Sequence, residues 1–419
     1  MKILMISEYF KPFEMGGGEI SAFALAKELV KEGFAMHVLT SWFRGVKKKE
    51  IVDGVVIHRL LKTGKNPSSI SDNIKRWLFF EKSMLNELEK LNNNENFDII
   101  HCMNITSIYA VKLKEKIRKK FILHVNSPVL FCPKGTLMHK DKEQCTLKCT
   151  RAEFFNCYIH STLVGKFELK IYDKYNPFFI YIYRKRYEEY LRLIGLFDHY
   201  APISSFMKER LLKRGIPDKN ITIIYNIIPL ERFMWQKQPK NKIKKILYIG
   251  EYSKPKGCHL LIDALKKIIL PYEANFYGDG ILRDYLTIEA QKHKLNVKIH
   301  GKVKYEDVPK IMQQHDIVVI PSLVGEAFCR VALEALAAGK SVIASNVGGV
   351  VDIVENKKTG YLFEPGDISD LQKKLVHAID NKHVQDEIRD IIKKKFSAKR
   401  VIQNVNNTYK LTMKRKDLK

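Results

Sequence analysis

Two glutamates, Glu326 and Glu334, lie eight positions apart in the segment 321–367. The pattern predicts a buried strand at 317–320, a loop that carries Glu326, and a helix that starts near Phe328 and carries Glu334 about two turns further on. The N–H groups at a helix N-terminus bind phosphate, and carboxylates accept hydrogen bonds from hydroxyl groups. The segment therefore indicates a site for a phosphorylated, polyhydroxylated ligand. The alternative is one capping glutamate and one surface glutamate without a ligand.

Glycines and a histidine mark further places where a ligand can approach the chain. Gly348 and Gly349 follow a predicted strand, and glycine lets the backbone come close to a ligand. A second run, residues 16–18, ends the loop after the first predicted strand. His124 closes an apolar strand at 121–124, where cleft residues of an α/β sheet are found, so we expect it in the site. The alternative is a structural core histidine.

The elements that must position these residues alternate between strand and helix. A strand at 3–6, a helix after the glycine run and a strand at 36–40 form a β-α-β unit, which implies a parallel sheet. A second series begins with a strand at 246–250 and a helix at 258–269, after a lysine-rich linker at 236–245. The sequence predicts two doubly wound α/β domains, with ligands beyond the carboxyl ends of the strands.

Positive charge is the unusual bulk property of the chain. Lysine and arginine number 73 against 46 acidic residues, a formal net charge of +27. Such a field attracts polyanions, but the chain has no nucleic-acid type of zinc-finger spacing, RNP-like motif or basic heptad region. Basic residues interleave with aromatics at 175–193, a pattern typical of a helix at a membrane surface. The alternative is a helix whose aromatic side packs into the core.

The chain contains no run of about 18 uncharged apolar residues, the length that a membrane span needs. The N-terminal apolar run stops at Glu8, which is too early for a signal peptide. We therefore expect a cytoplasmic protein, peripheral on the inner face of the cell membrane.

Four of the seven cysteines fall in one window: Cys132, Cys145, Cys149 and Cys157. The functional interpretations are a structural zinc site and a redox or disulfide element. The spacings fit no standard zinc knuckle, and a cytoplasmic setting disfavours stable disulfides. Free or structural thiols are preferred, and zinc stays the alternative.

The segment 321–367 resembles the signature of the family 4 retaining glycosyltransferases, glycosyltransferase group 1, which have the GT-B fold. Glu326 and Glu334 reproduce the E-x7-E pair of that family. The continuation follows the family pattern through Glu334-Ala335, Ala338-Gly339, Gly348-Gly349, Thr359-Gly360 and Pro365-Gly366. Outside the segment, the matching residues are 16–18, His124, Asn226, Lys256-Gly257, Leu260–Ala264, 277–280 and His300-Gly301. Residues 41–98 and the cysteine window match weakly or not at all.

The resemblance implies a role for each matched residue. Lys256 would hold the donor diphosphate, Glu326 the hydroxyls of the donor sugar, and Glu334 the ribose. Gly17 or Gly18 would offer backbone N–H groups near the diphosphate, and His124 would lie near the reacting centre on the acceptor side. The implied catalytic residues are His124, Glu326 and Lys256. The implied donor-binding residues are Gly17, Gly18, Lys254, Lys256, Glu326, Phe328, Glu334, Gly348 and Gly349.

Members of this family keep the anomeric configuration, with same-face attack in which the leaving phosphate helps to deprotonate the acceptor. This reaction needs positive charge where the diphosphate leaves, and a lysine supplies that charge without a metal. The sequence has no D-x-D element in a setting that suits a metal-bound diphosphate. We therefore expect no cofactor for catalysis, and a UDP- or GDP-sugar as co-substrate.

One departure from the family pattern concerns the donor diphosphate. The family usually has arginine directly after the glycine that ends the first strand of the C-terminal domain, but here Gly250 is followed by Glu251. Either Lys254 replaces the missing cation, or Glu251 turns toward solvent. The other consequences to consider are an unusual donor and a loss of activity.

The prediction is a hexosyltransferase of the α/β GT-B architecture, with two Rossmann-like doubly wound domains facing a central cleft. Residues 1–235 would bind the acceptor, residues 243–395 the nucleotide sugar, and 396–419 would form a helix that packs back on the N-terminal domain. Its partners would be the nucleotide-sugar donor, a glycan or lipid-linked acceptor and an anionic membrane surface, but no nucleic acid. The rivals are a catalytically decayed GT-B binding protein, a nucleic-acid-binding protein and a sugar epimerase of the same architecture.

Overall fold

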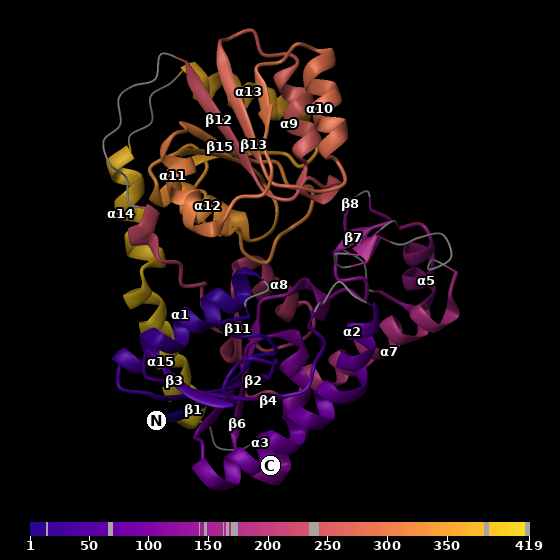
Figure 1. The fold of residues 1–419 in the computed structure, drawn as a ribbon, viewed down its shortest axis with the longest axis vertical. Coiled ribbons are helices and arrows are strands. Elements are labelled where there is room, and N and C mark those ends of the chain that lie inside the picture. Colours follow the sequence, from indigo (N-terminus) through magenta and orange to yellow (C-terminus); the bar gives the residue numbers. More distant parts are fainter. Residues whose placement is uncertain are drawn as a thin grey trace. The chain divides into compact units, whose positions relative to one another are not determined.

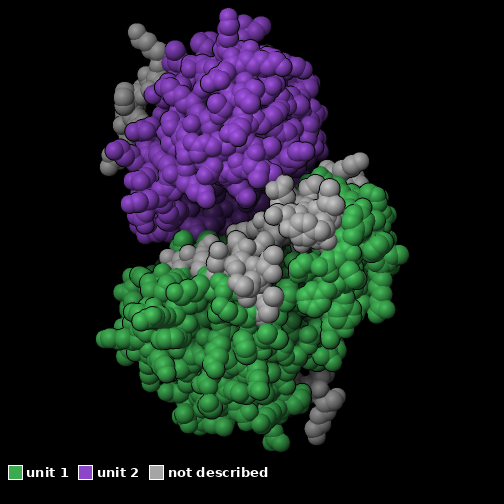
Figure 2. Space-filling view, turned by 45° about the vertical axis from the view of Figure 1, so that its right-hand side comes forward, with its two compact units in different colours: residues 1–141, 145–227, 398–419 green, residues 142–144, 228–397 purple. Residues whose placement is uncertain are grey.

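The computed structural model describes residues 1–13, 16–65, 70–141, 143–145, 149–161, 163–164, 167–168, 175–233, 243–380 and 385–414. The chain divides into two compact units, which are described separately (Figure 2). Unit 1 comprises residues 1–141, 145–227 and 398–419, and unit 2 comprises 142–144 and 228–397. Residues 236–242 of the expected linker and 415–419 of the expected terminal helix lie outside the described residues.

A seven-stranded sheet forms the centre of unit 1, with the strand order β11-β6-β5-β1-β2-β4-β3. All neighbours are parallel except β3, which runs antiparallel to β4 at the edge. The strands are β1 (Lys2–Ile6), β2 (Ala35–Ser41), β3 (Lys49–Val52), β4 (Val55–Leu61), β5 (Ile99–Cys102), β6 (Lys120–Val125) and β11 (His199–Pro202). The predicted parallel sheet is confirmed. The antiparallel edge was not predicted, because β3 is a short, lysine-containing segment.

Helices cover the faces of this sheet, which is why its central strands are continuous apolar runs (Figure 1). The helical segments of unit 1 include α1 (Gly17–Lys31), α2 (Ile70–Lys75), the π-helical turn η1 (Arg76–Phe80), α3 (Glu81–Glu95), the 3₁₀ helix η2 (Ile105–Leu113), α4 (Lys114–Ile117), α5 (Arg151–Ile159), α7 (Pro177–Ile194), α8 (Ser205–Leu212) and α15 (Ala398–Lys414). Of these, α5 packs against α7. The C-terminal α15 lies beside α1 in Figure 1. Val401, Val405 and Tyr409 of α15 are buried in the core of unit 1. The hydroxyl of Tyr409 lies 2.8 Å from His101 Nδ1.

Unit 2 contains a six-stranded, wholly parallel sheet in the order β14-β13-β12-β15-β16-β17. Its strands are β12 (Lys244–Ile249), β13 (Tyr272–Tyr277), β14 (Val297–Ile299), β15 (Ile317–Ile320), β16 (Ser341–Ser345) and β17 (Gly360–Phe363). Its helices are the 3₁₀ turns η5 (Leu230–Phe233), η6 (Lys254–Lys256), η7 (Tyr305–Asp307) and η8 (Gly348–Asp352), with α9 (Cys258–Leu265), α10 (Arg283–Lys292), α11 (Val308–Gln313), α12 (Arg330–Ala337), α13 (Ile368–Asp380) and α14 (Gln385–Phe396).

Two predicted helix boundaries in unit 2 were wrong. The helix expected near Phe328 begins at Arg330, so Glu326 and Phe328 lie in the loop before it. The helix expected to reach residue 269 ends at Leu265. Helix ends fray, and the apolar period alone does not mark where the chain leaves the helix. Among the described residues, no helix is long and apolar enough to cross a membrane.

Candidate functional site

Glu326 lies in the loop between β15 and α12 of unit 2, where its carboxylate has two partners. Lys256 Nζ lies 2.8 Å from Glu326 Oε1, and the hydroxyl of Ser322 donates a hydrogen bond of 2.9 Å to the same oxygen. Lys256 comes from the turn η6, so two segments far apart in sequence meet here. The side chains of Lys256 and Glu326 keep 33% and 26% of their surface exposed. The pair is thus held in place and still open to a ligand.

Glycines allow the backbone segments around this pair to approach each other. Gly348 has φ 73°, and a Cβ atom there would lie 2.5 Å from the backbone nitrogen of Glu326. The N–H of Gly349 donates to the carbonyl oxygen of Glu326 at 2.8 Å. Gly257 has φ 67°, and a Cβ atom there would collide with the carbonyl oxygen of Pro321. Both positions need glycine, because it alone combines the left-handed backbone with no side chain.

Lys256 carries its charge at neutral pH in this environment. Burial alone would lower the pKa of Lys256, but the neighbouring Glu326 carboxylate more than offsets this, and the net shift raises the pKa above its usual value. A fixed ammonium group of this kind can stabilise negative charge on a departing diphosphate.

Glu334 lies on α12 in a second, buried network. Its Oε1 accepts hydrogen bonds from the Tyr305 hydroxyl at 2.9 Å and from Arg330 Nη2 at 3.3 Å, and Arg330 Nη2 also donates to the Tyr305 hydroxyl at 2.8 Å. Burial raises the pKa of Glu334, while the Arg330 guanidinium opposes that shift. Arg330 precedes Glu334 by one helical turn, a spacing from which the ion pair was predictable. Tyr305 lies in no recognisable motif.

The remaining expected donor residues of unit 2 differ in exposure. Lys254 opens the turn η6 and is exposed, and Glu251 is exposed as well. The exposure of Glu251 agrees with the expectation that its side chain turns toward solvent. Phe328 is 7% exposed, and the centroid of its ring lies 6.3 Å from that of Phe396 in α14. The Phe328 side chain is therefore packed against α14 in the interior of unit 2.

In unit 1, Gly17 and Gly18 are the first two residues of α1, where helical N–H groups have no partner within the helix. A Cβ atom on Gly18 would lie 3.7 Å from Asn126 Nδ2, and Asn126 Nδ2 donates to the carbonyl oxygen of Met103 at 2.7 Å. The start of α1 and the loops after β5 and β6 therefore meet at the carboxyl edge of the sheet. His124, near the end of β6, lies at the same edge.

His124 is buried and neutral at pH 7. Its side chain lines a cavity of about 10 Å³ with Asn126 and Ser127, and its ring lies 5.4 Å from that of His101. Burial lowers the pKa of His124 to about 4. Among the described residues its Nδ1 has no hydrogen-bond partner. An uncharged imidazole at this edge can accept or donate a hydrogen bond without repelling a cationic group.

The basic and aromatic stretch at 175–193 forms most of α7, and its side chains divide between two sides. Tyr187 and Tyr190 are buried, as expected for an aromatic side in the core, whereas Phe178 and Tyr181 are 55% and 60% exposed. Arg184 does not extend freely into solvent. It donates to the carbonyl oxygen of Cys149 at 2.8 Å and to Glu188 at 2.9 Å.

The four clustered cysteines, Cys132, Cys145, Cys149 and Cys157, line one small cavity of about 30 Å³ and form no disulfide within the described part of the chain. Burial raises the pKa of Cys149 to about 12, with a further contribution from the neighbouring Cys132. Among the described residues, no three histidine, cysteine or acidic side chains are arranged to hold a metal ion. The preference for structural thiols over zinc stays a prediction.

Comparison with known proteins places the chain in a family. The model of glycosyl transferases group 1 matches residues 231–395, and that of glycosyltransferase family 4 matches residues 15–232, half of the chain. The chain is a family 4 glycosyltransferase. An uncharacterised glycosyltransferase of Methanocaldococcus jannaschii is 25% identical over 99% of both chains. The predicted glycosyltransferase enzyme, a hexosyltransferase, is thereby confirmed.

Two solved structures are similar to this glycosyltransferase in fold. Sucrose-phosphate synthase of Thermosynechococcus elongatus has a TM-score of 0.71 at 18% identity, covering 98% of each chain. Anabaena HepE in complex with UDP has a TM-score of 0.66 at 17% identity, covering 98% of this chain and all of that one. The predicted GT-B class, with two parallel-sheet α/β units, is confirmed.

Proposed function

We propose that this glycosyltransferase transfers a sugar from a nucleoside diphosphate sugar, with retention of the anomeric configuration, to a glycan or lipid-linked acceptor. The observation that carries the proposal is the Lys256–Glu326 pair, held by Gly348 and still open to solvent. An ammonium group for the diphosphate and a carboxylate for sugar hydroxyls are the two recognition elements that such a donor needs. The UDP bound to HepE, a protein of similar fold, supports a nucleoside diphosphate as the leaving group.

The proposed reaction balances without a cofactor. The acceptor hydroxyl oxygen forms a bond to the anomeric carbon on the face from which the diphosphate departs, and the bond between that carbon and the diphosphate oxygen breaks. Its electron pair leaves with the diphosphate, which takes up the proton of the acceptor hydroxyl. Lys256 stabilises the charge that grows on the leaving group, Glu326 positions the sugar, and Glu334 positions the ribose. We assign the acceptor side to unit 1, with His124 near the reacting hydroxyl.

A panel of UDP- and GDP-sugars tests this assignment. We expect the purified chain to release UDP or GDP from at least one of them, and Lys256→Ala to reduce that rate strongly. Lys292→Ala, which removes an exposed lysine from α10 of the same unit, is the matched control and should leave the rate unchanged. If no nucleotide sugar of the panel were bound or hydrolysed, the decayed binding protein would be the better description.

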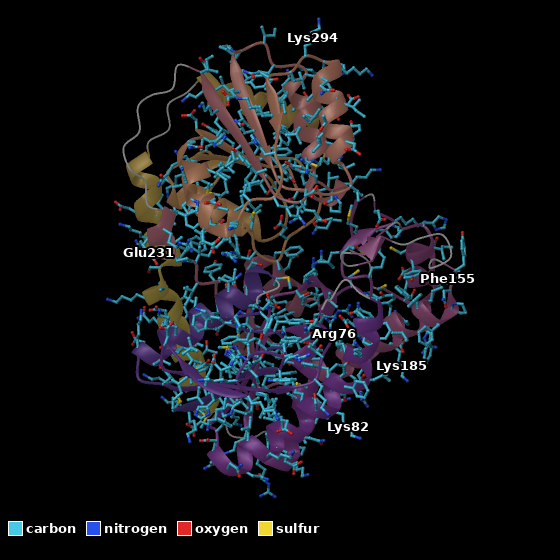
Figure 3. All side chains as sticks on the ribbon, viewed as in Figure 1. Arg76, Lys82, Phe155, Lys185, Glu231 and Lys294 are labelled. Atoms are coloured by element: carbon cyan, nitrogen blue, oxygen red, sulfur yellow. The ribbon has the colours of Figure 1, made fainter. Side chains whose placement is uncertain are left out.

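The acceptor is proposed to lie at an anionic membrane surface, next to unit 1. Phe178, Tyr181 and Lys185 are exposed along one side of α7, and Phe155 of α5 is 49% exposed. In Figure 3 the labelled Phe155, Lys185 and Lys82 lie along one side of the drawing of this unit. Exposed aromatics beside lysines suit the headgroup region, where each basic residue near anionic lipid contributes about 1 kcal/mol.

Co-sedimentation with vesicles tests the membrane contact. The wild type should bind vesicles that contain phosphatidylglycerol, bind neutral vesicles poorly, and detach as salt rises. The Phe178→Ser, Tyr181→Ser, Lys185→Glu variant should lose binding. The control, Ile281→Ser with Ile288→Ser, removes two exposed apolar side chains of unit 2 and should bind as the wild type does. Equal binding by the α7 variant would contradict the membrane contact and favour a soluble acceptor.

A further inference from the structure

Unit 1 contains a cavity of about 190 Å³ that the assigned residues do not use. Its walls come from η1, α7 and the loops after β5 and β6, so it lies toward the carboxyl edge of the sheet. Three cationic side chains line it, and four aromatic ones. The cationic residues are Arg76, Lys134 and Arg186, and the aromatic ones are Trp77, Tyr183, Tyr187 and Tyr190.

The three cations differ in how their charge is balanced. Arg76 Nε lies 2.5 Å from Glu8 Oε1, and Lys134 Nζ lies 2.9 Å from Asp141 Oδ1. Arg186 donates to the Tyr190 hydroxyl at 2.9 Å, and its guanidinium lies 5.6 Å from the Trp77 ring. In the described part of the chain Arg186 makes no ion pair with a carboxylate. A guanidinium that is partly removed from water without a counter-charge is unfavourable unless an anion pairs with it.

The indole of Trp77 forms part of the same cavity wall as Arg186. Its indole N–H is buried and has no hydrogen-bond partner among the described residues. The aromatic rings around it offer flat apolar faces, and the C–H side of a pyranose packs on such faces. The cavity thus combines an unbalanced guanidinium, a free indole donor and aromatic walls.

We propose that this cavity binds the phosphate-bearing sugar of the acceptor, with the phosphate on Arg186 and the sugar against Trp77. The identification of the ligand as the acceptor rests on the proposed function. The affinity of the cavity for a sugar phosphate is independent of that function. Arg186 forms charge-assisted hydrogen bonds to the phosphate, for which its planar donor fork is suited. The acceptor is then a phosphorylated or phosphate-linked sugar rather than a neutral glycan.

The fluorescence of Trp77 reports binding at this cavity alone. The full chain is titrated with α-D-glucose 1-phosphate, and the signal of a Trp77→Phe variant is subtracted as the background from the other two tryptophans. The wild type should show a saturable change that weakens as salt rises. Arg186→Gln should bind about tenfold or more weakly, as expected when a charge-assisted hydrogen bond is lost. Arg192→Gln, which removes an exposed arginine from the same helix α7 outside the cavity, is the matched control and should bind as the wild type does.

The proposal would be overturned by the absence of a Trp77 signal, by equal affinity in Arg186→Gln, by binding that salt does not weaken, or by a response to neutral glucose as strong as to the sugar phosphate. A response to phosphatidylglycerol vesicles but not to glucose 1-phosphate would identify a lipid headgroup site instead, and would also overturn it. If Arg186→Gln does not fold, two measurements on the wild type still test the proposal: the salt dependence of glucose 1-phosphate binding and the comparison of glucose 1-phosphate with neutral glucose. No nucleotide sugar is present in this titration, so its failure and the failure of donor turnover are separate results.

Discussion

The two units bring their functional residues to the sheet edge in different ways. In unit 2 the expected donor groups are already paired with protein side chains: Lys256 with Glu326, and Glu334 with Arg330 and Tyr305. In unit 1 the edge carries a neutral histidine, backbone N–H groups and the cavity with Arg186. The ion pairs of unit 2 hold its charged groups in place before a ligand arrives, whereas the cavity of unit 1 offers one guanidinium without a carboxylate partner, Arg186, among aromatic faces. This contrast predicts different sensitivities to mutation.

The largest effect is expected from the partly exposed Lys256–Glu326 ion pair of unit 2. Glu326→Ala and Lys256→Ala should each lower the transfer rate by about ten- to a hundredfold, because one removes sugar hydroxyl contacts and the other removes charge at the leaving group. The two residues touch, so the double variant should lose less than the sum of the two free-energy changes. Steady-state kinetics with the preferred donor measures this. Wild-type turnover in either single variant would show that the roles are wrong.

The buried network of unit 2 should respond in stability as well as in donor affinity. Glu334→Ala leaves the Arg330 guanidinium without its carboxylate and should destabilise unit 2 by about 3 kcal/mol. Tyr305→Phe removes one hydrogen bond to Glu334 and should cost about 1 kcal/mol. Denaturant unfolding measures the stability, and the KM for the donor should rise in both variants. A Glu334→Ala variant as stable as the wild type would contradict the pairing.

Acidification should lower the stability of unit 1 more than that of unit 2. Burial lowers the pKa of His58 and of His124 to about 4, against about 6.5 in an unfolded chain. Between these values the unfolded state binds more protons, so stability present above pH 6.5 is lost as the pH falls toward 4. At pH 5.5 each of the two histidines should lower the free energy of unfolding of unit 1 by about 1 kcal/mol relative to neutral pH.

Amide hydrogen exchange at pH 7.5 and pH 5.5 measures the change in stability of each unit separately. Protection should fall more in the sheet of unit 1, and His124→Gln should reduce that fall. His293→Gln, at an exposed histidine of unit 2, should not. An equal loss of protection in both units would contradict the account.

The smallest effect is expected from metal removal. If the thiols of Cys132, Cys145, Cys149 and Cys157 are structural, elemental analysis should find well below one zinc per chain. Dialysis against a chelator should then leave the melting temperature and the transfer rate unchanged. Close to one zinc per chain, with lower stability after chelation, would instead establish a zinc site in unit 1.

The sequence predicted unit 2 in more detail than unit 1, for physical reasons. The elements between Glu326 and Pro365 were predictable from the sequence because the loop, helix, strand and glycines follow one another along the chain. Gly348 was predictable because no other residue fits its position. The network around Glu334 was missed in part because Tyr305 comes from a different segment. In unit 1 the cavity gathers residues from four elements, and periodicity could not show that Arg186 faces inward while Lys185 faces solvent.

The most direct test of the proposed chemistry is the anomeric configuration of the first product formed. With the donor that the panel selects, proton NMR of the anomeric hydrogen, recorded before the free sugar equilibrates, gives the configuration of the product. Retention predicts the same anomer as in the nucleotide sugar, with one nucleoside diphosphate released for each sugar transferred. The opposite anomer would contradict same-face transfer at the Lys256–Glu326 site.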